Sequence, residues 1–351
     1  MLQERDLIKK FKSLRKEAQD MRSSLYHLTN QCNIRCKGCW FFEKDFDKRS
    51  NELSDIKKLE DFVLSEVERG VTSPLLIGGE PALFLERISV FKKHMQKVVV
   101  STNGLRKIPR NGFEDITIGI SVFGGGELDD ELRAIGPTGK RFRGLLDKAL
   151  KNYKYDDRVG FVYAVTQNGI SYIEETVKRI TDNGNRLVFN YYSDYTSEEN
   201  NKFLLKQKLF DTLIKVKERY PESVVSHPYY IKALVYGKTD WGEFNYLSCP
   251  SVSEDYEGNK SRLQLGGPSL PKFNAYAADM KTITQCCTSG DCKKCRDSQA
   301  ITSWLLVNAK SILKEPDGLR IWVEIAEAYF SQFVWSNYHP RNKLYDVNNA
   351  I

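Results

Sequence analysis

Residues 25–40 read LYHLTNQCNIRCKGCW. Residues 25–29 form an apolar, strand-like segment, and three cysteines follow, Cys32, Cys36 and Cys39, spaced Cys-x3-Cys-x2-Cys. Three thiolates this close together can hold three corners of an iron–sulfur cube, whose fourth iron then keeps an open position for a small molecule. The alternatives are most of a zinc site and buried thiols without a ligand.

Strand-like and helix-like segments alternate outward from this loop. Residues 3–22 predict an amphipathic covering helix, because Leu7, Phe11 and Leu14 fall on one face. A later helix is predicted to begin at the N-cap Ser54 and to end at Gly70. Strands are predicted at 25–29, 75–77, 97–100, 116–121, 161–165 and 186–190. This alternation predicts an α/β fold with a parallel sheet and right-handed crossovers, which binds ligands at the carboxyl ends of its strands.

Three further motifs follow predicted strands. The second strand leads into Gly78-Gly79-Glu80-Pro81, where the glycines let the backbone approach a ligand and the carboxylate can accept from an ammonium group. The third leads into Ser101-Thr102-Asn103-Gly104, and the fourth ends at Ser121 before three glycines. A simple Asn-Gly turn and a flexible glycine loop are the alternatives at the last two positions.

The motifs together resemble the radical S-adenosylmethionine (SAM) superfamily over roughly residues 20–235. The resemblance implies a partial (β/α)6 barrel, a 4Fe–4S cluster on Cys32, Cys36 and Cys39, and a reducing electron donor such as flavodoxin or ferredoxin. It also implies that SAM binds at Gly78, Gly79, Glu80, Pro81, Asn103 and Ser121. Many members carry an aromatic residue before the third cysteine, where this chain has Gly38. Trp40 is therefore the candidate for the adenine contact.

A second cysteine set comprises Cys249, Cys286, Cys287, Cys292 and Cys295. Cys249, Cys292, Cys295 and one of the adjacent pair supply four thiolates, enough for a complete auxiliary cluster. This part of the chain resembles the shortened SPASM-type module called twitch, which implies one auxiliary 4Fe–4S cluster. A structural four-cysteine zinc site and free thiols are the alternatives.

The chain divides into a predicted capping helix (1–23), a barrel (24–240) and a C-terminal cysteine-rich, partly helical module (241–351). Its 351 residues carry a net charge of +7 and are 41% apolar, which is ordinary for a folded soluble protein. Scattered basic residues predict no nucleic-acid partner, but a positive field favours an anionic small molecule. Clustered cysteines and the absence of a signal-like start or a long apolar run predict a cytoplasmic protein without a membrane span.

The resemblance implies an enzyme that reductively cleaves SAM to a 5′-deoxyadenosyl radical, which takes a hydrogen atom from a substrate. A small molecule of specialised metabolism is the leading substrate hypothesis, with an oxidoreductase or lyase outcome in biosynthesis. A maturase of ribosomally made peptides is the first alternative, although residues 1–23 are too short for a winged-helix peptide-binding segment. A glycyl-radical-enzyme activase is the second, and a non-enzymatic zinc scaffold is a hypothesis of another class. The sequence assigns no catalytic side chain.

Overall fold

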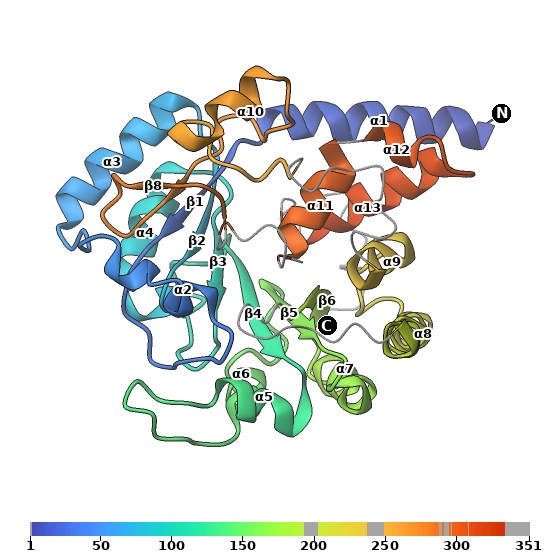
Figure 1. The fold of residues 1–351 in the computed structure, drawn as a ribbon, viewed down its shortest axis with the longest axis horizontal. Helices are drawn as coiled ribbons and strands as arrows, with labels where there is room; N and C mark the ends of the chain where they lie inside the picture. Colours follow the sequence, from blue (N-terminus) through green and yellow to red (C-terminus); the bar gives the residue numbers. More distant parts are fainter. Residues whose placement is uncertain are drawn as a thin grey trace.

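The computed structural model describes residues 2–192, 203–236, 249–287, 290, 295, 297–307 and 309–333. Within these residues eight strands form one sheet, in the order β6-β5-β4-β3-β2-β1-β7-β8 (Figure 1). The strands are β1 (Ser23–His27), β2 (Ser73–Ile77), β3 (Val99–Thr102), β4 (Thr117–Phe123), β5 (Val159–Val165), β6 (Arg186–Tyr191), β7 (Ala275–Tyr276) and β8 (Ile283–Thr284). Strands β1 to β6 pair in parallel, which confirms the predicted α/β fold and its six barrel strands.

The described helices are α1 (Leu2–Asp20), α2 (Trp40–Glu43), α3 (Ile56–Arg69), α4 (Leu85–His94), α5 (Gly126–Arg133), α6 (Leu145–Asn152), α7 (Ile173–Asp182), α8 (Phe203–Arg219), α9 (Pro228–Tyr236), α10 (Lys260–Gln264), α11 (Ser298–Val307), α12 (Ala309–Ile312) and α13 (Gly318–Phe333). Helices such as α3, α4, α6 and α7 cover the outer side of the sheet (Figure 1). The prediction for the start of α3 was wrong by one residue. Asp55, and not Ser54, is the N-cap, because its carboxylate accepts from the backbone N–H groups of Lys57 and Lys58. Gly70 ends this helix in the left-handed conformation, as predicted.

Side chains alternate between the two faces of each strand. Outward-facing residues such as Tyr26, Leu76 and Ile118 are buried under the helices in the main hydrophobic core. Several inward-facing residues are small, namely Ser73, Ser101, Gly119, Ser121 and Ala164. Bulky branched side chains usually fill the interior of a parallel barrel. The small residues leave that interior open, and a cavity lies there.

The C-terminal segment adds to the sheet. Strand β7 pairs in parallel with β1, with Leu25 opposite Ala275 and Tyr26 opposite Tyr276, and β8 pairs antiparallel with β7. Strands of two residues carry no periodic signal, so the sequence predicted no strand here. Strands from the predicted module 241–351 therefore continue the sheet of the predicted barrel domain.

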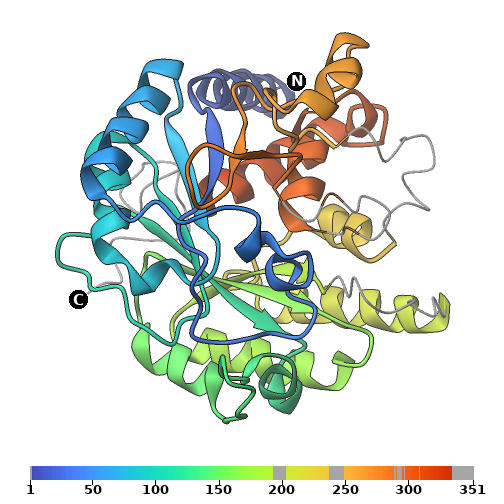
Figure 2. The ribbon, with the colours of Figure 1, turned by 60° about the vertical axis from the view of Figure 1, so that its left-hand side comes forward.

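The last helices lie across the open side of the partial barrel, between β6 and the end of α1 (Figures 1 and 2). Helix α11 contacts β6 and α9, and α13 contacts α1. Phe11 of α1 meets Trp322 of α13 with ring centroids 4.7 Å apart, and Lys10 pairs with Glu327 at 3.1 Å. The apolar face of α1 is thus covered by a helix from the other end of the chain.

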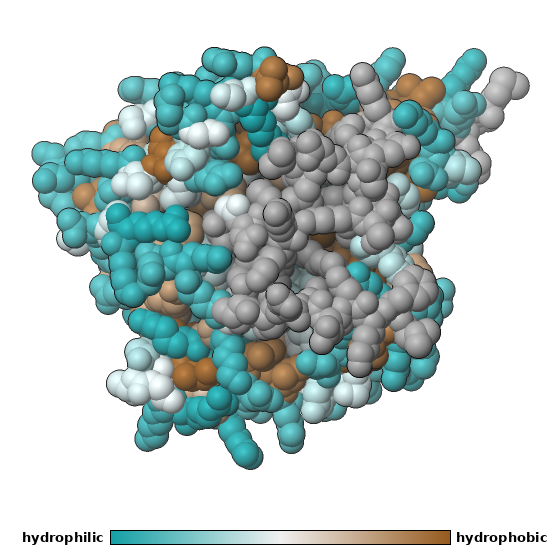
Figure 3. Space-filling view, viewed as in Figure 1, coloured by the Kyte–Doolittle hydropathy of each residue, from teal (hydrophilic) through white to brown (hydrophobic). Residues whose placement is uncertain are grey.

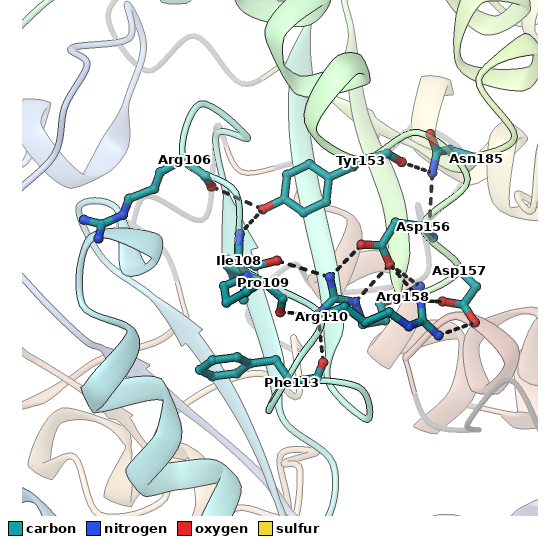
Figure 4. Close-up of polar contacts among 10 residues, drawn as sticks. All are labelled: Arg106, Ile108, Pro109, Arg110, Phe113, Tyr153, Asp156, Asp157, Arg158 and Asn185. Carbon is teal, nitrogen blue, oxygen red and sulfur yellow. Dashed lines mark hydrogen bonds and ion pairs between the residues drawn. The ribbon is translucent and has the colours of Figure 1, made fainter.

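A buried polar network braces the amino ends of the strands, opposite the cysteine loop (Figure 4). Arg158, which precedes β5, donates to the carbonyls of Ile108, Pro109 and Phe113 at 2.8–3.2 Å. It also forms an ion pair with Asp156 at 2.6 Å. Polar residues at this end of a parallel barrel stabilise the fold, whereas ligands bind at the other end.

Hydrophilic residues cover most of the face in Figure 3 outside the grey atoms, and hydrophobic ones lie among them in small groups. Among the described helices, none has both the length and the apolar character that crossing a bilayer demands.

Candidate active site

The cysteine loop at the carboxyl end of β1 is held in place by backbone contacts with the end of α5. The N–H of Arg35 donates to Ile135 at 2.7 Å, and that of Lys37 donates to Leu132 at 2.7 Å. The Arg35 guanidinium donates to the Cys32 carbonyl at 3.1 Å and lies 3.9 Å from the centroid of the Phe42 ring. These contacts fix the loop that carries the three thiols.

A cavity of about 350 Å³ runs from this loop into the barrel. Its volume falls in the range of small-molecule sites. Cys32, Cys36 and Cys39 line it together with inward-facing residues of strands β1 to β6. The first residues of α11 and Tyr329 of α13 form another part of its wall. The predicted cluster loop and the carboxyl ends of the strands therefore face one cavity.

The three thiols lie in a poorly solvated environment. Burial raises the pKa of Cys32 and of Cys36 to about 12, and it also raises the pKa of Cys39. Arg133 is 2% exposed, lines the cavity and places its guanidinium beside the Cys36 thiol. Its Nη1 atom lies 3.1 Å from Asp129 and donates to the Ser121 carbonyl. A permanent positive charge is thus buried next to the candidate metal ligands.

Cysteine, histidine and carboxylate side chains do not gather in threes around a single-ion position anywhere in the described ranges. A mononuclear zinc site needs its sulfur ligands within about 2.3 Å of one point. A cube spreads its thiolates over separate irons. Cys32, Cys36 and Cys39 remain the candidate ligands of a multi-iron cluster.

Glu80 joins the loops that follow β2 and β3. Its carboxylate accepts from the Thr102 hydroxyl at 2.6 Å, the Asn103 N–H at 2.8 Å and the Ala82 N–H at 3.0 Å. Burial raises the pKa of Glu80, although these donors act in the opposite direction. The carboxylate accepts three hydrogen bonds of about four that its lone pairs permit. Through these bonds Glu80 positions the two loops.

Gly79 lets the Gly78-Gly79-Glu80-Pro81 loop pack closely against the cysteine loop. A Cβ atom at this position would lie 2.0 Å from the Gln31 carbonyl oxygen, so no other residue fits. The Gly79 N–H donates to Thr29 at 2.8 Å and the Glu80 N–H donates to Gln31 at 2.7 Å. Asn103 completes the junction, because its amide donates to the Asn33 side chain at 2.7 Å.

Gly38 stands where many superfamily members carry an aromatic residue, and its surroundings show why a side chain does not fit there. Its φ angle is +68°, and a Cβ atom there would lie 2.3 Å from the Tyr192 hydroxyl oxygen. Tyr192, at the end of β6, donates that hydroxyl to the Lys37 carbonyl at 2.8 Å and lines the cavity. An aromatic ring therefore packs beside this position, but it comes from a distant part of the chain.

The structure brings most of the predicted SAM-binding residues to one place. Gly78, Gly79, Glu80, Asn103, Ser121 and Trp40 all line the cavity. Pro81 does not; it is buried as the first residue of a short 3-10 helix, Pro81–Leu83. Asn168, which the resemblance also suggests as a polar SAM contact, follows β5, is exposed and is not among the residues that line the cavity. Tyr195, a tyrosine after the sixth predicted strand that could line the cavity, lies outside the described residues.

His27 faces the interior below Trp40, Phe41 and Phe46, with ring centroids 5.2–5.6 Å away. It is 1% exposed, and burial lowers its pKa to about 3. Neither ring nitrogen has a hydrogen-bond partner among the described residues. His27 is therefore a neutral side chain inside an aromatic box rather than an acid or base in the cavity.

The second cysteine set is described in part. Cys249, Cys286, Cys287 and Cys295 have described positions, and Cys292 lies outside the described residues. Burial raises the pKa of Cys249 to about 12, and the thiols of Cys295 and Cys286 add to the shift. These three side chains are therefore neighbours, although Cys249 and Cys295 are far apart in the sequence.

Polar residues that sequence reasoning missed line the part of the wall opposite the cysteine loop, namely Asn190, Asp297, Ser298, Gln299, Thr302 and Tyr329. Asp297 accepts from the Gln299 N–H at 2.9 Å, and the side-chain amide oxygen of Asn190 accepts from the Ser298 N–H at 3.0 Å. The N-capping pattern Asp-Ser-Gln before an apolar run was the available signal. Its position against the end of β6 was not readable from the sequence.

No family model matches the chain. A curated protein, pre-heme d1 synthase of Dinoroseobacter shibae, is 28% identical over 171 residues, which cover 46% of this chain and 40% of that protein. The chain thus matches less than half the length of this relative. Among solved structures, polyhistidine-tagged anSMEcpe with bound AdoMet has a TM-score of 0.50 at 14% identity, covering 87% of this chain and 98% of that one.

The structural match shows a shared fold over most of the chain. The sequence match is separate from it and covers about half of the chain. The Cys-x3-Cys-x2-Cys loop lies at the carboxyl end of β1, above a cavity and beside the Gly-Gly-Glu-Pro loop. The chain thus shares its fold with an AdoMet-bound protein and is similar in sequence, over about half of its length, to pre-heme d1 synthase.

Proposed function

We propose that this chain is a radical SAM enzyme that acts on a small molecule within the barrel cavity. One observation carries the proposal. Cys32, Cys36 and Cys39 line the same cavity of about 350 Å³ as Gly79, Glu80, Asn103 and Ser121, residues that lie far apart in the sequence. A cofactor held by the cysteines would therefore meet SAM and substrate in one cavity.

The residues present fit a 4Fe–4S cluster on the first set. Three thiols on one fixed loop leave one iron open, and the buried Arg133 guanidinium beside Cys36 offsets the negative charge of such a cluster. When reduced, the cluster supplies the electron that cleaves SAM to methionine and a 5′-deoxyadenosyl radical, which removes a hydrogen atom from the substrate. The protein's part is to bind, orient and exclude water.

Arg133 is the candidate partner for the SAM carboxylate. Its Nε atom is buried and has no hydrogen-bond partner within the described chain, and its side chain lines the cavity. A buried guanidinium with an unused donor favours an anionic group. Glu80 keeps about one acceptor position for the SAM ammonium, and the Ser121 hydroxyl can contact the ribose.

Tyr192 and Trp40 are the candidate adenine contacts. Both rings line the cavity, and Tyr192 packs beside Gly38. Either ring offers a face on which adenine can stack. Tyr192 is the stronger candidate, because it lies beside the residue that is aromatic in many superfamily members.

Cys249, Cys292, Cys295 and one of Cys286 and Cys287 are proposed to hold an auxiliary 4Fe–4S cluster in a twitch-like module. The proximity of Cys249, Cys286 and Cys295 supports it. The first turn of α11 then contributes Asp297, Ser298 and Thr302 to the cavity wall. These polar groups favour a hydrogen-bonding metabolite over an apolar substrate.

An acidic electron-transfer protein such as flavodoxin or ferredoxin is proposed as the electron donor. The net charge of +7 speeds association with an acidic partner. The proposed reaction also requires one electron for each SAM cleaved.

The test is anaerobic reconstitution followed by dithionite and SAM. We expect brown protein with about eight irons per chain if both clusters form, and 5′-deoxyadenosine detected by mass spectrometry. A variant with Cys32→Ala, Cys36→Ala and Cys39→Ala should form no 5′-deoxyadenosine. Leu265→Ala, at a position that is 88% exposed, is the matched control. Cleavage of SAM by the triple variant, or a colourless protein that binds only zinc, would refute the proposal.

A further inference from the structure

The second cysteine set holds one thiol more than a cubane cluster can use. It contains Cys249, Cys286, Cys287, Cys292 and Cys295, and a fully ligated 4Fe–4S cluster takes four thiolates. The two candidates for exclusion are the adjacent pair that directly follows β8. Their surroundings in the structure distinguish them.

Cys286 lies on the side of Cys249. It forms an antiparallel bridge with Val252, three residues after Cys249, and the N–H of the next residue, Ser253, donates to the Gln285 carbonyl at 3.0 Å. This backbone pairing places Cys286 beside the segment that follows Cys249.

Cys287, the next residue, has different surroundings. Cys287 is 4% exposed and packs in a small apolar cluster with Leu25, Phe273 and Ala275. Leu25 is an inward-facing residue of β1 that also lines the cavity. The Cys287 side chain is thus directed toward the barrel interior.

The lining of the cavity distinguishes Cys287 from Cys286 more clearly. Among the second-set cysteines with described positions, Cys287 alone lines the space that Cys32, Cys36 and Cys39 also line. Asp297 lines it as well and acts on the pKa of Cys287, which burial raises well above its usual value. The neighbouring thiols of Cys286, Cys249 and Cys295 raise it further. Cys287 therefore lies at the boundary between the second cysteine set and the reaction cavity.

We propose that Cys249, Cys286, Cys292 and Cys295 hold the auxiliary centre, while Cys287 is a substrate-facing thiol that determines specificity. The inference rests on the proposed function for the existence of that centre. Beside Leu25 the thiol presents a small, polarizable surface, and beside Asp297 it borders the polar part of the wall. This combination suits a small substrate with an apolar edge next to hydrogen-bonding groups.

The first experiment compares the matched variants Cys286→Ala and Cys287→Ala after anaerobic reconstitution. We expect Cys286→Ala to lose about four irons per chain and Cys287→Ala to keep the iron content and the paramagnetic spectrum of the wild type. Loss of about four irons by Cys287→Ala, or full retention by Cys286→Ala, would overturn the assignment.

The second experiment needs no variant and so does not depend on their folding. Iodoacetamide is added to cluster-loaded wild-type protein without oxygen, and the modified residue is located by fragmentation mass spectrometry. Burial and the raised thiol pKa slow this reaction at Cys287, but we still expect alkylation at Cys287 to exceed that at the cluster ligand Cys286 by at least tenfold. Equal labelling of the two, or labelling of Cys286 alone, would contradict the proposal.

The two experiments also separate this inference from the proposed function. If the reconstituted protein cleaves no SAM but Cys287 is still labelled and only Cys286→Ala loses iron, the proposed activity fails and the assignment stands. If SAM is cleaved but Cys287→Ala loses about four irons per chain, the activity stands and the assignment fails.

Discussion

Tyr26 of β1 and Tyr276 of β7 lie opposite each other in the sheet register. Their rings are stacked with centroids 5.5 Å apart, and both hydroxyls donate to the buried carboxylate of Glu66, at 2.5 and 3.0 Å. Arg69 pairs with the same carboxylate at 2.7 Å. Helix α3 and the C-terminal strand β7 are thus bound to the strand that leads into the cysteine loop.

Removing one hydroxyl of this group should loosen the C-terminal segment. We expect Tyr276→Phe to lower the free energy of unfolding by about 1–2 kcal/mol, because one donor to a buried carboxylate is lost. Amide hydrogen exchange in residues 273–287 should become faster. Tyr155→Phe is the control, because Tyr155 is 69% exposed. Unchanged exchange in this segment would show that Glu66 does not couple β7 to β1.

Substitution at Gly38 should disturb the cysteine loop through Tyr192. Gly38→Ala places a Cβ atom 2.3 Å from the Tyr192 hydroxyl oxygen at a φ of +68°, and the backbone conformation alone costs about 1–3 kcal/mol. Gly112→Ala isolates that cost, because Gly112 has a φ of +81° with open space around it. We expect Gly38→Ala to lower the thermal midpoint and the iron content more than Gly112→Ala does.

Adding Tyr192→Ala should restore part of the iron content that Gly38→Ala loses, because the smaller side chain removes the clash. A double variant that binds no more iron than Gly38→Ala would contradict the packing explanation.

His27 should make the protein sensitive to acid. Burial lowers its folded pKa from 6.5 to about 3, so the unfolded state binds a proton in the interval where the folded state does not. The stability that depends on neutral His27 is complete above pH 6.5 and is lost as the pH falls toward 3. From pH 7.5 to 5.5 this loss amounts to about 1.4 kcal/mol.

The matched variant is His27→Leu, which has no titrating group in the aromatic box. Anaerobic urea unfolding should show its stability relative to the wild type rising by about 1.4 kcal/mol between pH 7.5 and 5.5. A difference that stays constant over this interval would mean that His27 is protonated, or solvated, in the folded protein.

Arg158 should be important for stability and unimportant for the cofactor. Arg158→Met leaves three carbonyls without this donor and Asp156 without its buried partner, which lie 2.6–3.2 Å from the guanidinium. We expect a loss of about 3–5 kcal/mol in the free energy of unfolding, with unchanged iron content per folded chain. Arg110→Met is the control, because Arg110 is 50% exposed in its ion pair with Asp157 and such a pair contributes about 1 kcal/mol or less.

The sequence by itself was sufficient to predict the barrel strands and the functional loops that follow them. Apolar runs such as 75–77 and 116–121 are local signals, and the parallel arrangement follows from their alternation with helices. Because parallel strands place their carboxyl ends at one edge, the meeting of Cys32, Gly79 and Asn103 was also predictable.

Only the tertiary structure decided what completes the cavity. The ring beside Gly38 comes from Tyr192, and the wall opposite the cysteine loop comes from Asp297 and Tyr329. The pairing of β7 with β1 and the different surroundings of Cys286 and Cys287 were equally hidden. These relationships join segments far apart in the chain through short pieces of backbone without periodicity, and such contacts depend on packing rather than on any local preference of the residues.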